Sequence, residues 1–169
     1  EMLGNDLFPR DYIYALDAPT NYVGPTRVFG DAGADVLRSI DDAEAAFPHA
    51  HKVSLSVSHL PEPLIDAIDA FALANAVRDL RGEGASHRSM LINVSRFTDV
   101  QMQVAALVEQ HVREMQADIR NYSRLSVMEA LKNPSLKRLQ KTWDEEFAGN
   151  LEFDWSEIQH ALKDAVLPI

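Results

Sequence analysis

Cysteine is absent from this sequence of 169 residues, which excludes disulfide bonds, a thiol nucleophile and thiolate metal ligands. Long apolar runs are absent as well. The most apolar stretch, residues 64–80, is broken by polar side chains, so we expect no membrane-spanning helix. The chain also lacks the basic and apolar regions of a secretory signal and does not begin with methionine, so we expect a cytoplasmic piece of a longer protein.

Basic residues are also outnumbered: 16 lysines and arginines stand against 26 aspartates and glutamates, which gives a net charge of −10. This balance argues against a protein that coats nucleic acid without specificity. The exception is the stretch 120–141, in which six basic residues face only Glu129, and an acidic stretch, 142–157, follows it. The simplest interpretation is two solvated faces that attract each other, and a phosphate-facing surface is the alternative. The basic residues are Arg120, Arg124, Lys132, Lys137, Arg138 and Lys141.

The motifs of common enzyme sites are missing. No glycine is followed by lysine, which excludes a phosphate-binding loop, and no Glu-x-Lys nuclease pattern occurs. Asp144-Glu145-Glu146 lies in a helical pattern and indicates an exposed acidic face. His49, His51 and His59 lack a third ligand at metal-site spacing, and His111 is expected to be a hydrogen-bonded core residue. We therefore expect no catalytic residue, no metal site and no cofactor within this chain.

Hydrophobic periodicity predicts a chain that is mainly helical. Alternation of Val53, Leu55 and Val57 with serines predicts a half-buried strand, and the apolar run within 89–95 predicts a central strand. A further strand is predicted at 12–16. Helices are expected at 34–47, 61–80 and 98–119, then from Ser123 to about 131, from Pro134 to about 148 and from about 155 to 166.

The fold class that follows is α+β and predominantly α-helical. Residues 53–119 form a strand–helix–strand–helix unit, whose strands would be parallel by the right-handed crossover rule. The chain then divides into a loop-rich N-terminal segment, 1–33, an α/β unit, 34–119, and a helical arm or insertion, 120–169.

Several residues are placed to cap these helices. Thr98 or Asp99 can cap the long helix, and Ser123 can cap the shorter helix that follows it. Asn133-Pro134 puts proline at a first helical position. Asp154, with Glu157 three residues later, predicts a capping box for the last helix.

The candidate site is the junction Ser95-Arg96-Phe97-Thr98-Asp99, between the predicted central strand and the long helix. The carboxyl end of such a strand, facing a helix N-terminus, is where phosphates bind in open α/β sheets. Arg96 adds a guanidinium fork that suits phosphate oxygens. The alternative is a structural turn, in which Arg96 pairs with an aspartate and Thr98 only caps the helix.

The run His87-Arg88-Ser89-Met90-Leu91-Ile92-Asn93-Val94-Ser95-Arg96-Phe97-Thr98-Asp99-Val100-Gln101 resembles the signature of the Z-one (Z1) domain, a family described as endonucleases. In that family a strand of the form Met-Leu-x-x-x-Ser-Arg-Phe follows a histidine and leads into a long helix. Residues 6–11, 21–24, 64–71 and 80–82 also resemble the family, so the resemblance covers most of 6–119.

The resemblance implies a superfamily-two helicase-type ATPase from bacterial or phage defence or restriction-like systems. Such proteins have two RecA-like lobes, and this chain would supply part of the second lobe. The phosphate-binding loop would precede Glu1 and the arginine-bearing motifs would follow Ile169, so ATP and Mg²⁺ are expected only for the parent protein. Ser95, Arg96 and Thr98 would contact the nucleic-acid backbone. No residue here supports the endonuclease description.

Two functions follow as hypotheses. The first is a non-catalytic fragment of a helicase-like, nucleic-acid-dependent ATPase, with nucleic acid and the rest of the ATPase chain as partners and a homodimer formed through newly exposed faces. The alternative is a free-standing helical module that binds a protein partner through an apolar groove. ATP hydrolysis by a longer version of the protein, stimulated by nucleic acid, would favour the first. A stable protein complex of this chain alone would favour the second.

Overall fold

The computed structural model of the chain describes residues 24–30, 37–38, 40, 43–147, 149 and 152–166. The chain divides into two units, Glu1–Ile40 and Asp41–Ile169. In the first unit, the described part holds one helix, α1 (Pro25–Phe29), which begins at a proline and buries none of its residues. The strand predicted at 12–16 lies outside the described residues.

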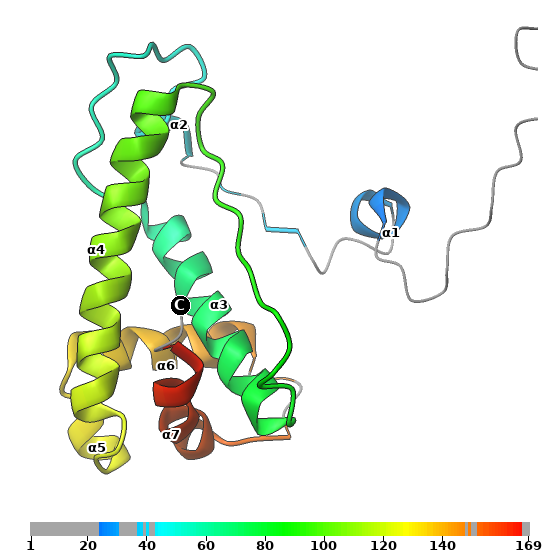
Figure 1. Ribbon diagram of the computed structural model, residues 1–169, viewed down its shortest axis with the longest axis vertical. Helices are drawn as coiled ribbons and strands as arrows, with labels where there is room; N and C mark the ends of the chain where they lie inside the picture. Colours follow the sequence, from blue (N-terminus) through cyan, green and yellow to red (C-terminus); the bar gives the residue numbers. More distant parts are fainter. Residues whose placement is uncertain are drawn as a thin grey trace, which may run out of the picture. The chain divides into compact units, whose positions relative to one another are not determined.

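The second unit is built from helices (Figure 1). Two of them, α3 and α4, are long, and α6 and α7 pack against both. The prediction of a mainly helical chain is therefore confirmed. No helix among those described is long and apolar enough to cross a bilayer. The helices of this unit are α2 (Ala43–Ala46), α3 (Glu62–Leu80), α4 (Thr98–Tyr122), α5 (Val127–Ala130), α6 (Pro134–Glu146) and α7 (Trp155–Val166).

The core of this unit forms where α3 meets α6 and α7. Ala72, Leu73 and Ala76 of α3 are fully buried, as expected for a helix that is apolar nearly all round. From α6, Trp143 enters the core and stacks on Phe147 with 5.4 Å between ring centroids. The other core side chains of α6 and α7 recur at helical spacing on one face of each helix: Leu136, Leu139, Ile158, Leu162, Ala165 and Val166.

The strands predicted at 53–57 and 89–95 are not formed. Residues 24–30, 43–147 and 152–166 contain helices, turns and irregular chain but no strand, so the α+β class and the partial RecA-like second lobe are wrong. Both predicted strands of the α/β unit lie in irregular segments, at 53–57 and 89–95. No backbone–backbone hydrogen bond joins these two fully described segments. Because a strand exists only through a neighbouring strand, alternation alone could not make one.

The segment at 53–57 bonds instead to a side chain of α4. The backbone N–H of Val57 donates to Gln103 Oε1 over 2.9 Å, and Gln103 Nε2 donates to the carbonyl of Leu55 over 3.1 Å. The glutamine amide therefore replaces part of a strand ladder. Leu55 and Val57 are half-buried, while Val53 is exposed. The alternation of apolar and polar residues therefore predicts which side chains turn inward, but it does not predict a strand.

The segment at 89–95 keeps the period of two without a sheet. Met90, Ile92 and Val94 are half-buried and pack against the core, whereas Leu91 is 91% exposed. Its connection to α4 is again through a glutamine, since Gln101 Nε2 donates to Asn93 Oδ1 over 2.8 Å. An extended chain lying on helices satisfies the same inside–outside pattern as a strand in a sheet.

Helix ends set by local side chains are confirmed at α6 and α7. Asn133 Oδ1 accepts hydrogen bonds from the backbone N–H groups of Ser135 and Leu136, and Pro134 is the first residue of α6. At α7, the N–H of Glu157 donates to Asp154 Oδ1 over 2.9 Å, and the N–H of Asp154 donates to Glu157 Oε2 over 2.8 Å. This reciprocal pair is the predicted capping box.

Three other helix predictions are wrong. Phe97 is the N-cap of α4, and no side chain caps it, so neither Thr98 nor Asp99 does so. Ser123 is the C-cap residue of α4, and Ser126 caps α5 instead. The helix predicted at 34–47 shrinks to α2, since residues 37, 38 and 40 are not helical and the remaining predicted residues before α2 lie outside the described part.

Candidate functional site

The predicted junction sits at the start of α4 rather than at a sheet edge. Ser95 Oγ accepts a hydrogen bond from the backbone N–H of Phe97 over 3.0 Å, which folds the chain into the helix. Ser95 is half-buried, while Arg96 and Thr98 are exposed. The site therefore keeps an exposed hydroxyl, a guanidinium and the free N–H groups of a helix N-terminus.

Arg96 makes no ion pair with any residue in the described part of the chain. Its guanidinium carbon instead lies 4.9 Å from the centroid of the Phe97 ring. The Phe97 ring also contacts the His51 ring, with 5.4 Å between centroids, so the segment before α3 reaches this junction. Stacking on an aromatic face orients the guanidinium while its N–H groups stay exposed to solvent. The alternative, in which Arg96 pairs with an aspartate, is not the arrangement found.

The histidines near this junction do not converge on a metal site. His59 Nδ1 lies 3.0 Å from Ser58 Oγ, and both residues are exposed. Across the described residues, no three histidine, aspartate or glutamate side chains are grouped to hold a metal ion.

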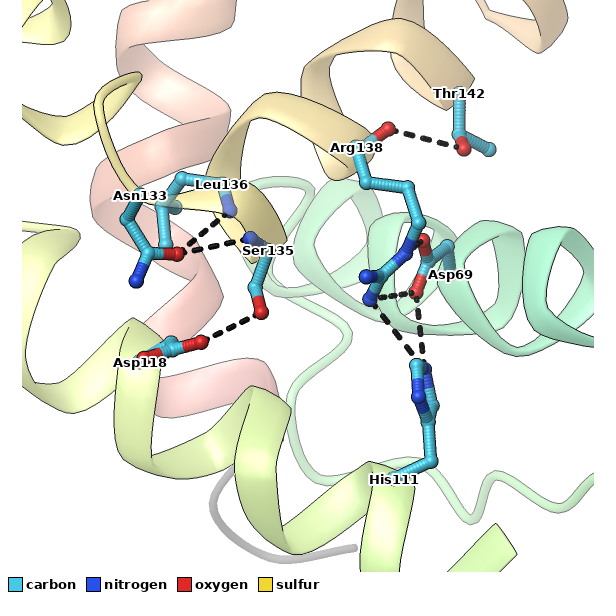
Figure 2. A network of polar contacts seen from close by, with 8 residues as sticks. All are labelled: Asp69, His111, Asp118, Asn133, Ser135, Leu136, Arg138 and Thr142. Atoms are coloured by element: carbon cyan, nitrogen blue, oxygen red, sulfur yellow. Dashed lines mark hydrogen bonds and ion pairs between the residues drawn. The ribbon is translucent and has the colours of Figure 1, made fainter. Parts of the chain in front are cut away.

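A buried ion pair joins α3, α4 and α6 (Figure 2). Arg138 of α6 donates from Nε to Asp69 Oδ2 over 2.6 Å and from Nη2 to Asp69 Oδ1 over 3.3 Å. His111 of α4 places Nε2 3.4 Å from Arg138 Nη2 and 3.8 Å from Asp69 Oδ1. The Asp69 side chain is fully buried, so this network holds three helices in register.

This network is not predicted by the sequence patterns above, although the sequence carries one signal of it. Asp69 is a carboxylate on the most apolar helix of the chain, and a buried carboxylate needs a partner. The partner Arg138 could not be named from sequence because it is distant along the chain and lies in a run of basic residues. His111, predicted to be a hydrogen-bonded core residue, does contact Arg138 Nη2, but it is half-buried at the helix interface and is not part of the core.

The basic stretch does not act as one charged surface. Arg138 is used by Asp69, Lys132 pairs with Glu129 over 2.7 Å, and Lys141 pairs with Glu145 over 3.7 Å. Asp144, Glu145 and Glu146 are exposed on α6, as predicted. The phosphate-facing interpretation of 120–141 is therefore weakened, because half of its charge is already compensated within the chain.

A pocket of about 570 Å³ was also not predicted. It lies between α3 and α4, with the segment 84–92 as a wall and the end of α7 at one side. Arg88 of this wall forms an ion pair with Asp79 and donates to the backbone carbonyl of Asn75 over 3.1 Å. The signal in the sequence is Asn75 and Asp79, two polar residues one helical turn apart on an apolar helix.

Comparison with known proteins gives one match. The model of the Z1 domain family matches residues 63–169, well over half of the chain. These residues include all but the first residue of α3, together with α4, α6, the junction and the pocket. No curated protein and no solved structure matches the chain.

Proposed function

The chain belongs to the Z1 domain family, and from that premise we propose that it is a non-catalytic helical part of a helicase-like, nucleic-acid-dependent ATPase. In this proposal Ser95, Arg96 and Thr98 contact the phosphate backbone. ATP and Mg²⁺ would be held by other parts of the parent protein. The observation that carries the proposal is the exposed guanidinium of Arg96, which has no carboxylate partner within the described residues.

Physical chemistry favours a phosphate at this position. The Phe97 ring restricts the Arg96 side chain, so less rotamer freedom is lost when the guanidinium binds. The N-terminal N–H groups of α4 and the Thr98 hydroxyl add donors, and the helix dipole favours an anion. The carboxylate of Asp99, in the first turn of α4, repels the phosphate and keeps the phosphate contact weak. Such contacts position a strand and carry no sequence preference.

The test compares Arg96→Ala with Arg113→Ala in the full-length protein. Arg113 lies on α4, the helix that follows Arg96, and it is 73% exposed and pairs only with Glu109 among the described residues. We expect Arg96→Ala to weaken nucleic-acid binding equally for nucleic acids of different sequence. It should also lower the slope of log affinity against log salt concentration by about 1. Melting temperature should not change, since Arg96 is on the surface.

The Arg113→Ala variant should bind with the affinity and salt slope of the unmodified protein. Equal losses in the two variants would reduce the effect to general surface charge and contradict the proposal. A large fall in melting temperature for Arg96→Ala, with unchanged binding of the folded protein, would give Arg96 a structural role instead.

A further inference from the structure

The pocket between α3 and α4 has two unlike sides. One face of α3 supplies Ile68, Phe71, Asn75 and Asp79, which follow one another at successive helical turns. Val108 and Val112 of α4 line the opposite side and are half-buried. The pocket is therefore mainly apolar, with polar groups gathered toward Asn75 and Arg88. A volume of about 570 Å³ is within the range of pockets that bind small molecules.

Asn75 is a buried polar residue of this pocket whose side chain bonds to none of the described residues, and it is 2% exposed. Its backbone carbonyl is occupied, since Arg88 Nη1 donates to it over 3.1 Å. Gln159, another buried amide of the described residues, is partly used: its Nε2 donates to the carbonyls of Ser123 and Leu125, while its Oε1 is buried without a partner. The Asn75 amide is not among the polar atoms that are sealed from solvent without a partner, so it opens into the pocket, where it is available to an occupant.

The charges around the pocket select an uncharged occupant. The two terminal nitrogens of the Arg88 guanidinium are engaged by the Asp79 carboxylate and by the backbone carbonyls of Asn75 and Glu83, and its Nε is buried without a partner. Asp164, at the side formed by α7, is an exposed carboxylate with no ion pair in the described part of the chain. His87 is exposed at the rim. A phosphate would therefore meet a free carboxylate rather than a free guanidinium.

We propose that this pocket binds a planar, uncharged heterocycle of the nucleobase type, held at its edge by the Asn75 amide. The apolar walls, with the Phe71 ring among them, suit the flat faces of such a ligand. An asparagine amide pairs with adjoining acceptor and donor atoms, and in adenine these are N7 and the N6 amino group. The best ligand is therefore adenosine rather than its phosphates. This inference is independent of the phosphate contact proposed for Arg96.

The experiment titrates adenosine into the isotopically labelled protein and follows the side-chain NH₂ resonances of Asn75 by NMR. We expect these resonances and the methyl groups of Val108 and Val112 to shift together and to saturate. AMP and ATP should bind at least tenfold more weakly, because Asp164 repels their phosphates. Absence of shifts at Asn75 with adenosine, or tighter binding of ATP, would overturn the proposal.

Two variants separate the amide from the fold. Asn75→Asp keeps the shape of the side chain but loses the NH₂ donor, and it should weaken the binding of adenosine at least tenfold. Asn121→Asp is the matched control, because Asn121 is exposed near the end of α4 and does not line the pocket. If Asn75→Asp does not fold, Val112→Met narrows the pocket from α4 and should also weaken adenosine. Unchanged affinity in a folded pocket variant contradicts the proposal, and Arg96→Ala should leave adenosine binding intact.

Discussion

Two regions of the second unit are held together in different ways. The helices α6 and α7 satisfy their backbone groups internally, begin at side-chain caps and bury one face each in the core. The segments 53–57 and 89–95 have no regular backbone ladder and rest on α4. Gln103 bonds to Leu55 and Val57, and Gln101 bonds to Asn93. The first turns of α4 therefore organise both extended segments.

The difference between the regions is one of independence. A capped amphipathic helix carries its own hydrogen bonds and needs a neighbour only for its apolar face. An irregular segment satisfies few of its backbone groups by itself (in 53–57, a turn bonds the Leu55 N–H to the Lys52 carbonyl), so neighbouring groups must supply the rest. We expect substitutions in α6 and α7 to change global stability, and substitutions of the α4 glutamines to loosen one segment. Three substitutions test this, in order of expected effect.

The largest effect is expected at the buried ion pair of the helical region. Asp69→Ala leaves the partly exposed Arg138 without its carboxylate and removes two charge-assisted hydrogen bonds, and we expect a loss of about 2–3 kcal/mol in the free energy of unfolding. Chemical denaturation measures this loss. Glu109→Ala, which removes an exposed ion pair with Arg113, should cost less than about 1 kcal/mol.

A double variant sharpens this prediction. Asp69→Leu combined with Arg138→Met replaces both charges with apolar groups and should regain most of the stability. If Asp69→Ala alone costs no more than Glu109→Ala, then the ion pair does not hold α3 and α6 together.

An intermediate and local effect is expected in the extended region. Gln103→Ala removes both hydrogen bonds to residues 55–57, and we expect the free energy of unfolding to fall by about 1–2 kcal/mol. Hydrogen exchange should accelerate at the Val57 amide and stay unchanged in α7. Gln110→Ala is the control, since Gln110 is exposed on α4 and bonds to Glu114 on the same helix. Equal acceleration in α7 would show that the two regions are not independent.

The smallest effect is expected at the capping box of α7. Asp154→Ala removes the acceptor of the Glu157 amide, and we expect a cost of about 1 kcal/mol. Thermal unfolding measures it, with Asp144→Ala in the exposed face of α6 as the control. A loss no larger than that of the control would mean that α7 is fixed by its core contacts alone.

The candidate sites differ in how far sequence reasoning reached. Arg96 was singled out from its position before a helix, and the structure places it before that helix, exposed. No sheet forms among the described residues, so the proposal for Arg96 rests on the guanidinium and the helix N-terminus. The Asn75 pocket was missed because its walls come from α3, α4, α7 and segment 84–92, which only tertiary packing brings together.

The sequence by itself determined the helices whose signals are local. Asn133-Pro134, the pair Asp154 and Glu157, and the apolar spacing in α3, α4, α6 and α7 each act within a few residues, and each gave the observed helix. Only the tertiary structure decided the conformation of residues 53–57 and 89–95, and only the tertiary structure decided which residue pairs with Asp69. Strand pairing and buried ion pairs depend on groups distant along the chain, so their outcome is set by which elements pack together.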